Sequence, residues 1–592
     1  MNQTGLSQSM HPKVTSDLLS APKTEEEWLR LTLPYYPSSV KFFNRNKIPY
    51  VFAVSPLKAN PESVKCPPKS VIPRCQSCNA LPSKYINVNS SKWTCALCEQ
   101  ENEIKHSTFL PRFEEYDISL GIEKEKPLFL FILQSTHFLA NEDTKKAIGE
   151  NLDAWAQSSK SYVALVTLNT NYTAFDLSKP TSQVLIEPEN IHIPICSSQE
   201  ANFEKALNTL SPSTFSKELI FEQLKFITSS IHLKCVCVCL FADQIKEPEE
   251  FDPEFAEILS SRRFSFHLFS EKKADCAKFA KFCDRVRLFD EECAHLIAPE
   301  LSKFLNSGIL FRSQIYFYSP PSFELLQISS RRNVTSSKLT LTVLDGQMSL
   351  MPQYKMKYSP QKSFISFQIT IDAVYPNGNH IIRVLNFITR PVTNVEKFDG
   401  VAFGCFIARM IAVEAYFESI EAAYKKYHDE CITLITAWSD EGNYRRAILS
   451  IFRDVPLLLY AIQNCDLFRR GSTGTEINAM MINLMSSTVE EMRRMLYPMM
   501  LLPPLNFPHR LQMSSIGQFK LVVFLRAYDG VAVVFDDKPH TEEIEAISQK
   551  YKLPITLYTD EKYAHQLVLE DNSISFSQFT EKLEVEVNGR RF

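Results

Sequence analysis

The chain has 592 residues, of which 45% are hydrophobic and 22% charged, and its formal net charge is −4. A single hydrophobic core seldom grows beyond about 250–300 residues, so this length predicts several domains. The weak negative charge excludes a global basic field for nucleic acid. The 14 glycines form neither a G-x-G-x-x-G nor a G-x-x-x-x-G-K-[ST] motif, which argues against a nucleotide-binding enzyme.

The first part of the chain predicts an arm followed by a short strand. Residues 1–29 are rich in Ser, Thr, Pro and Lys and lack the apolar stretch of a secretory signal, so we expect a poorly ordered arm and a cytosolic chain. The apolar run 48–54, closed by Ser55 and Pro56, predicts a strand. The fifteen cysteines, an odd number, argue against a disulfide framework.

Two Cys-x-x-Cys pairs, Cys75/Cys78 and Cys95/Cys98, are separated by 16 residues. Each pair can turn two thiolates toward one point, and two pairs supply the tetrahedral shell of four sulfurs that Zn²⁺ prefers. Four thiolates leave no open coordination position, so the predicted zinc is structural rather than catalytic. The alternative, four unliganded core cysteines, fits this specific spacing poorly. We therefore predict a zinc ribbon over residues 60–108.

The segment 124–310 has the pattern of an α/β domain. Apolar runs alternate with helical periodicity, which is typical of a mostly parallel sheet covered by helices on both faces. These runs are 128–133, 162–168, 235–241 and 264–269. Cys235, Cys237 and Cys239 recur at period 2 on one strand, and we expect them to be buried core thiols rather than metal ligands.

The rest of the chain predicts three further domains. Alternating apolar and polar residues over 311–395 predict antiparallel β structure. Over 396–505 the apolar period changes to that of helices, and the apolar residues between 403 and 411 form one stripe. Segment 506–592 combines two apolar strands with two amphipathic helices, which indicates a small α+β domain. No catalytic motif such as H-E-x-x-H or G-x-S-x-G occurs in the chain.

The collinear order of these parts resembles the inner-coat subunits of the COPII vesicle coat, the Sec twenty-three and Sec twenty-four family. The resemblance covers about residues 30–590. Several short stretches resemble the cargo-adaptor member more than its GTPase-activating sister. They are 30–34, 46–50, 55–57, 71–75, 93–98, 382–385, 390–392, 455–460 and 495–498.

The resemblance implies a multidomain α/β and α+β fold. An interrupted β-barrel or sandwich would be formed by residues 30–59, a strand and linker at 109–123, and residues 311–395. The zinc ribbon would occupy 60–108 and a von Willebrand-A-like trunk 124–310. A helical domain at 396–505 and a gelsolin-like domain at 506–592 would complete the chain.

The resemblance also implies a function. The protein would not be an enzyme but a cargo adaptor for transport from the endoplasmic reticulum to the Golgi. Its partners would be the GTPase-activating sister subunit, paired through the trunk, the small GTPase and outer-coat subunits of the coat, and the cytosolic tails of cargo and SNAREs. It would be cytoplasmic and peripheral on acidic membrane at endoplasmic reticulum exit sites and on COPII vesicles, without nucleic acid.

Two sites of the family are altered in this sequence. An acidic-signal pocket uses basic residues beside the first zinc knuckle; Arg74 matches one of them, whereas Asn79 stands at the second. Arginines of a barrel strand align with Thr340 and Thr342, so the pocket would be weak, because a carboxylate gains most from bidentate Arg. Residues 134–137 of the trunk lack the carboxylate that Mg²⁺ requires, and we predict no metal there.

Two other functions remain open from the sequence. The GTPase-activating sister would insert an arginine into the phosphoryl-transfer site, but no arginine here lies in a motif for that role. A nucleic-acid-binding zinc ribbon would need a basic face with interleaved aromatic side chains. The ribbon does contain such residues, although a small soluble ribbon would contain them as well. They are Lys65, Lys69, Arg74, Lys84, Lys92, Tyr85 and Trp93.

Overall fold

The structure is a computed structural model, and the account below is restricted to the residues that it describes. These are 28–65, 70–134, 142–168, 172–179, 183–186, 193–210, 220–242, 245–289, 296–330, 334–392, 398–438, 454–468, 471–502, 508–509, 520–526, 530–536, 538, 540–551, 553–558 and 576–589. Nearly all of the expected N-terminal arm, and residues 135–137 of the trunk, lie outside them.

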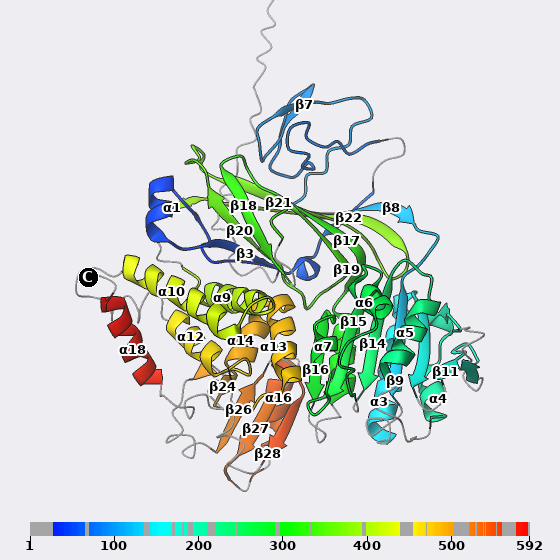
Figure 1. The fold of residues 1–592 in the computed structure, drawn as a ribbon. Helices are drawn as coiled ribbons and strands as arrows, with labels where there is room; N and C mark the ends of the chain where they lie inside the picture. Colours follow the sequence, from blue (N-terminus) through cyan, green and yellow to red (C-terminus); the bar gives the residue numbers. More distant parts are fainter. Residues whose placement is uncertain are drawn as a thin grey trace, which may run out of the picture.

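A β domain of two mostly antiparallel sheets lies across the top of the molecule (Figure 1). One sheet has the order β1 (Leu29–Leu31), β3 (Tyr50–Val54), β20 (Met351–Met356) and β18 (Phe323–Ser329). The other has the order β19 (Lys338–Asp345), β17 (Ile309–Tyr318), β21 (Ile365–Val374), β22 (Asn379–Thr389), β8 (Glu115–Ile122) and β4 (Glu62–Val64). Both sheets therefore combine strands from before and after the trunk.

Aromatic side chains join these two sheets. Phe52 of β3 contacts Phe367 and Phe387 of the second sheet, with ring centroids 4.8 and 5.0 Å apart. Tyr354 of β20 lies 5.2 Å from the same Phe367. Aromatic rings prefer offset and edge-on orientations, so these contacts favour one particular arrangement of the two sheets in addition to burying apolar surface. Shorter elements flank the domain: β2 (Tyr36–Pro37), α1 (Val40–Asn46), η1 (Pro56–Lys58) and β23 (Pro391–Val392).

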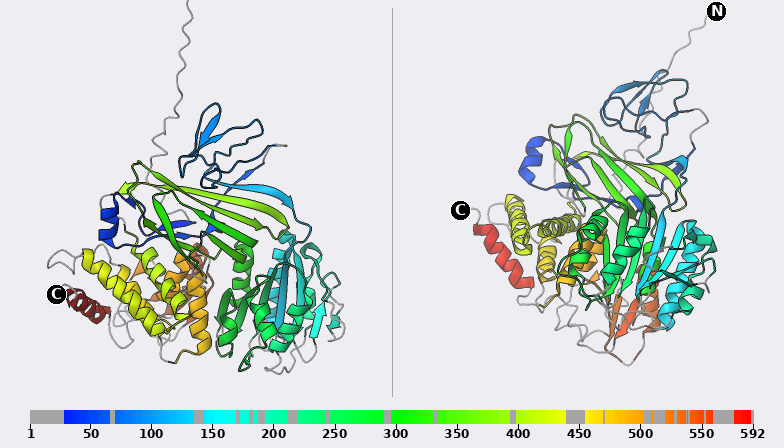
Figure 2. Two further views of the ribbon diagram at one scale, coloured as in Figure 1. Left: turned by 45° about the horizontal axis from the view of Figure 1, so that its top comes forward. Right: turned by 45° about the vertical axis from the view of Figure 1, so that its right-hand side comes forward.

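The ribbon is a small three-stranded unit on the outer side of the β domain (Figures 1 and 2). Its strands are β5 (Asn87–Val88), β6 (Lys92–Thr94) and β7 (Glu101–Glu103). Trp93 at its centre is fully buried. The buried amide of Gln368 on β21 fastens the ribbon to the sheet, because it accepts from the Leu81 N–H at 2.7 Å and donates to the Leu81 carbonyl at 2.8 Å.

The trunk is an α/β unit whose sheet has five consecutive parallel strands that extend to one edge. The sheet order is β12 (Gln183–Ile186), β11 (Tyr172–Phe175), β10 (Tyr162–Leu168), β9 (Leu128–Gln134), β14 (Val236–Ala242), β15 (Phe264–Glu271) and β16 (Arg285–Phe289), and β13 (Cys196–Ser197) also pairs with β10. One face is covered by the helices α3 (Glu142–Ser159), α4 (Phe203–Asn208) and α8 (Ile297–Asn306). The other face is covered by α5 (Ile220–Ser230), α6 (Pro253–Ser260) and α7 (Ala277–Ala280). The short helix η2 (Ser198–Glu200) precedes α4. Cys235, Cys237 and Cys239 are buried in the core beneath the first set, as predicted.

The helical block surrounds a central helix, α9 (Gly400–Ala415). Helices α10 (Ile420–Trp438), α12 (Asp454–Asn464), α13 (Gly474–Ser486) and α14 (Val489–Leu496) pack against it. The sequence predicted a single apolar stripe on α9, but in the structure every residue of this helix except Glu414 is buried. The buried surface of α9 is wider than the predicted stripe because this helix also contacts β3 and β18 of the β domain.

The last part of the chain divides between two places. A sheet has the order β25 (Pro508–His509), β24 (Met499–Leu501), β26 (Leu521–Leu525), β27 (Gly530–Val534) and β28 (Ile555–Tyr558), with α16 (Thr541–Tyr551) beside it. The final helix, α18 (Phe576–Gly589), instead packs on α10 and α12 through Phe579, Leu583 and Val587. Among the described helices, none has the length and apolar character needed to cross a bilayer.

Candidate metal centre and a groove beside an edge strand

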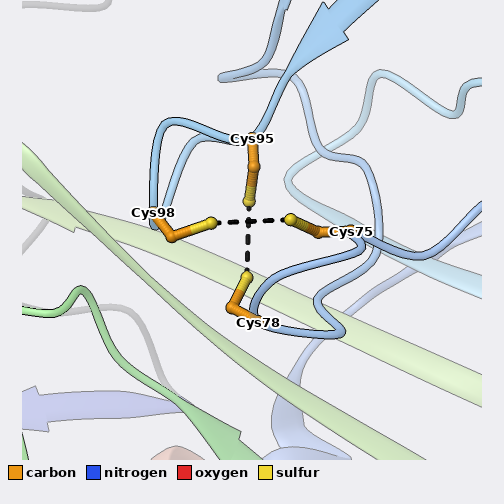
Figure 3. A group of neighbouring side chains, drawn as sticks. All are labelled: Cys75, Cys78, Cys95 and Cys98. Atoms are coloured by element: carbon orange, nitrogen blue, oxygen red, sulfur yellow. Dashed lines mark hydrogen bonds between the residues drawn. The ribbon is translucent and has the colours of Figure 1, made fainter. Parts of the chain in front are cut away.

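Four cysteine sulfurs of the ribbon converge on one point, as Figure 3 shows. They lie within 4.8 Å of one another, with Cys75 and Cys98 sulfurs 3.5 Å apart and Cys78 and Cys95 sulfurs 3.6 Å apart. A tetrahedral zinc with Zn–S bonds of about 2.3 Å requires sulfurs about 3.8 Å apart. The four side chains therefore fit a metal ion without rearrangement of the backbone.

The two knuckles have the same backbone geometry, which explains how each presents its thiols. The N–H of Asn79 donates to the Cys75 carbonyl at 2.9 Å, and that of Glu99 donates to the Cys95 carbonyl at 3.0 Å. Asn79 and Glu99 have left-handed backbone angles, with φ of 62° and 63°. Asn tolerates this conformation better than most residues, so the asparagine at the expected basic position suits the turn.

Hydrogen bonds within the cluster favour the thiolate of Cys95, and a neighbouring side chain supports the cluster from outside. The hydrogen bond from Cys78 lowers the pKa of Cys95 to about 5, and the same contact raises the pKa of Cys78. Asn102 donates to the Cys75 sulfur at 3.7 Å and accepts from the Gln76 N–H at 2.9 Å. Hydrogen bonds of this kind orient metal ligands. The four cysteines could therefore bind a metal ion, and with no open position that ion would support the fold rather than catalysis.

Arg74 and the two threonines that were aligned with pocket arginines belong to different parts of the fold. The Arg74 guanidinium donates to the Asn79 carbonyl at 3.1 Å, and its charge acts on Tyr116 of β8. Thr340 and Thr342 lie on β19. Arg74 is not among the described residues that line the groove beside these threonines, so a carboxylate-binding pocket shared by the three residues stays a prediction.

The two threonines instead line a groove between β19 and the trunk. The groove has a volume of about 440 Å³. Its trunk wall is formed by residues 259–262 together with Phe264, Phe282 and Asp284. The polar main chain of β19 forms the opposite side, where Thr342 Oγ1 donates to the Arg262 carbonyl at 3.0 Å. Periodicity predicted the strand, but the sequence carried no signal for this groove.

The outer edge of β19 directs main-chain groups into this groove. Antiparallel strands alternate residues that bond to the neighbouring strand with residues whose amide and carbonyl point away. Ser337 bonds inward, since its carbonyl accepts from the Phe317 N–H at 3.0 Å, so the even residues point outward. The outward Thr342 carbonyl accepts from the Cys235 thiol at 3.4 Å. The outward N–H and C=O of Thr340 have no backbone partner among the described residues.

One serine–histidine–aspartate contact deserves comparison with a hydrolase triad. Ser265 Oγ donates to Asp284 at 2.6 Å and lies 3.1 Å from His267 Nε2. In a catalytic triad the histidine lies between the other two groups, whereas here the serine does. Ser265 and His267 are also buried, so this serine cannot attack a substrate. Nothing in this contact supports hydrolysis.

Comparison with known proteins identifies the fold. No protein-family model and no curated protein sequence matches the chain. The structure of the human COPII-coat protein Sec24c matches 95% of this chain and 94% of that chain, with a TM-score of 0.76 and 12% identity. A von Willebrand factor type A structure from Catenulispora acidiphila matches 62% of this chain and 90% of that chain, with a TM-score of only 0.35 and 8% identity. The chain therefore has the fold of Sec24c over nearly its full length, and the predicted architecture is confirmed.

Proposed function

We propose that this protein is the cargo-selecting adaptor subunit of a COPII-type vesicle coat. The observation that carries the proposal is the match to Sec24c over 95% of the chain, which includes ribbon, trunk, β domain and helices in one order. A shared domain fold alone seldom fixes function, but the same long succession of unlike domains is a far more specific likeness. On this proposal the protein is a scaffold and not an enzyme.

The proposed partners follow from the coat assignment. The trunk would pair with the GTPase-activating sister subunit, and the assembly would bind the small GTPase, outer-coat subunits and acidic membrane of the endoplasmic reticulum. The four cysteines of the ribbon would hold one structural Zn²⁺, which suits a shell of four thiolates. Cargo and SNARE tails would be the ligands, and Arg74 alone would be a weak anchor for their carboxylates, because it already donates to Asn79.

We place the binding of a cargo tail in the groove beside β19. An extended peptide can add to a free sheet edge through main-chain hydrogen bonds, with its alternate side chains entering neighbouring pockets. The outward amide and carbonyl of Thr340 offer such an edge, and Leu259, Phe282 and Leu341 offer apolar contacts. Lys338 and Arg262 in the same lining would favour a tail with an acidic residue.

A co-elution experiment tests the coat assignment. The purified chain is mixed with the GTPase-activating coat subunit of the same organism and run on a size-exclusion column. A one-to-one complex, in which this chain adds no GTPase stimulation of its own, supports the adaptor. Stimulation of the small GTPase by this chain alone would transfer the assignment to the sister subunit. Absence of both behaviours would contradict any coat role and direct attention to nucleic acid and the ribbon.

A pair of variants at one position tests the groove. Thr340→Pro removes the outward N–H without removing a bond to β17, and proline is tolerated on edge strands. Thr340→Val removes the hydroxyl but keeps the main chain. With labelled SNARE-tail peptides we expect about tenfold weaker binding for Thr340→Pro, the size of one lost hydrogen bond, and an unchanged Kd for Thr340→Val. Equal losses in both variants would exclude pairing through the strand edge.

A further inference from the structure

A second cavity, of about 230 Å³, lies where three parts of the molecule meet. It is formed by the carboxyl ends of β15 and β16, by α13 and α14, and by the residue that follows β26. Figure 1 shows β16 beside α13, with the C-terminal sheet below them. In α/β sheets, ligands bind outside the carboxyl ends of the strands, at the point where the strand order reverses. This cavity lies at the carboxyl end of the sheet, but beside β15 and β16 rather than at the reversal between β9 and β14. A ligand there is therefore inferred from the lining of the cavity rather than from its position.

The lining combines cations with an apolar wall. Lys272 comes from the trunk, Arg494 from α14 and Arg526 from the C-terminal sheet. The apolar wall includes Phe289 at the end of β16 and Met495 of α14. Charged side chains that face an apolar wall suit a small ligand with one polar end.

The acidic residues of the lining are largely engaged elsewhere. Glu300 is buried and accepts from the Arg287 guanidinium at 3.2 Å, so this pair is neutral. Glu476 caps α13 and accepts from the Thr473 N–H at 2.8 Å. Asp466, the third acidic residue, is exposed at the rim. An anion within the cavity would therefore meet little direct repulsion from its floor.

Arg494 is the cation of the lining that is best placed to contact an anion. No carboxylate in the described part of the chain pairs with it, and its Nε–H is buried without a hydrogen-bond partner. A buried donor that lacks a partner costs free energy. A carboxylate or phosphate can accept two hydrogen bonds from one guanidinium in a planar arrangement. Such a group in the cavity would accept from the exposed part of the Arg494 guanidinium and lie near the cations of the two other segments.

We infer that this cavity binds a small organic anion, whose carboxylate or phosphate contacts Arg494 and whose short apolar chain lies against Phe289 and Met495. Because the ligand would touch trunk, helical block and C-terminal sheet at once, it would hold these parts together. A ligand that binds only the folded chain stabilises it. The inference does not depend on the coat assignment, since it rests on the cavity alone.

Calorimetric titration of the full-length chain tests the inference. The probes are hexanoate, hexyl phosphate, inorganic phosphate and hexanol, which separate the acidic group from the apolar chain. We expect hexanoate or hexyl phosphate to bind and raise the unfolding temperature, and hexanol to bind at least tenfold more weakly. Comparable binding of hexanol, or no binding by any probe at millimolar concentration, would overturn the inference. Binding by inorganic phosphate alone would also overturn it, because the apolar wall would then have no part.

Variants of two neighbouring arginines locate the site. Arg494→Gln should weaken hexanoate or hexyl phosphate binding at least tenfold, and Arg494→Lys should restore part of the affinity. Arg493→Gln is the matched control, because Arg493 is on the same helix but does not line the cavity. An equal loss for Arg493→Gln would mean non-specific attraction and refute the assignment. Thermal unfolding of each variant without probe establishes that it is folded.

Discussion

Glu491 is a buried carboxylate whose charge is held by cations from other elements. Lys303 of α8 donates to it at 3.2 Å, and Glu491 itself is buried on α14. Burial alone would raise the pKa of Glu491, but Lys303, Arg285 and Arg287 offset this and bring the pKa to about 2. The folded state therefore keeps this group ionised under conditions in which an unfolded chain would bind a proton.

The stability due to Glu491 should depend on pH. A carboxyl with a lowered folded pKa contributes fully above its unfolded pKa of 4.5, and the contribution is lost as the pH falls toward about 2. This shift corresponds to about 3 kcal/mol. Glu491→Gln should lower the unfolding temperature at pH 7, and its difference from the wild type should shrink between pH 4.5 and 2. Glu490→Gln, on the more exposed neighbour, is the control; a constant difference across this range would contradict the assignment.

Arg409 is a buried cation that no carboxylate of the described residues contacts directly. It is fully buried on α9 and donates to the carbonyls of Leu484, Ser349 and Ser487 at 3.1, 2.7 and 2.6 Å. Burial lowers the pKa of Arg409 to about 9, so the group remains protonated at neutral pH. The side chain thus donates to main-chain carbonyls of two segments, the end of α13 and the residues just before β20, at the junction of the helical block with the β domain.

Replacement of Arg409 should be strongly destabilising. Arg409→Met leaves several buried carbonyls without donors, and we expect a loss of about 3 kcal/mol or more. Arg409→Lys should recover little, because an ammonium cannot reproduce the planar fork of donors. Urea unfolding followed by circular dichroism measures both. If Arg409→Lys were as stable as the wild type, the carbonyl contacts would not be the reason for this arginine.

At the scale of elements, the ribbon with its cluster of four cysteines was the part most readily predicted from sequence. Its ligands come as two local pairs, so the spacing within each knuckle already determines the geometry that the structure has. The groove beside β19 could not be predicted in this way. Its open edge depends on which residues of β19 bond to β17 and on where the trunk stops, and both are set by contacts between distant segments.

Loss of a ribbon ligand should release metal and loosen the ribbon. In Cys95→Ser we expect the loss of about one zinc per chain, because a structural site with three thiolates binds more weakly and the binding free energy is folding free energy. Trp93 is buried in the ribbon core and should become exposed, with a red shift in its fluorescence. Metal analysis and fluorescence measure the two effects, and Cys196→Ser, at a thiol outside the ribbon, is the control. A wild-type chain without bound zinc would contradict the site.

The pairing of strands that lie far apart in the chain could not be predicted from the apolar pattern. Alternation of apolar residues predicted antiparallel β structure over 311–395, the segment that contains β21 and β22. It did not predict that β3 pairs with β20, about 300 residues later in the chain. That pairing is selected by packing, such as Phe52 against Phe367, which only the folded chain brings together. The resemblance to a known architecture supplied what periodicity could not.

Across the whole molecule, a cluster of buried charges joins trunk, β domain and helical block. Arg285 of β16 donates to Asp345 of β19 at 2.9 Å and to Gln347 at 2.5 Å. Arg287 of the same strand donates to Glu300 and to Asn483 of α13, at 3.2 and 3.1 Å. Each ion pair is buried, so neither can be solvated if its partner is removed. The cluster therefore couples the three parts energetically.

This coupling predicts the thermal behaviour of a variant. Arg285→Met leaves Asp345 buried without its direct cationic partner, which should cost about 3–5 kcal/mol. Because the cost falls on the contact between domains, we expect the calorimetric transition of the wild type to separate into two at lower temperature. The double variant Arg285→Met with Asp345→Asn removes the unpaired charge and should recover part of the loss. A single transition that moves equally in both variants would show that the cluster stabilises the trunk alone and does not connect it to the β domain.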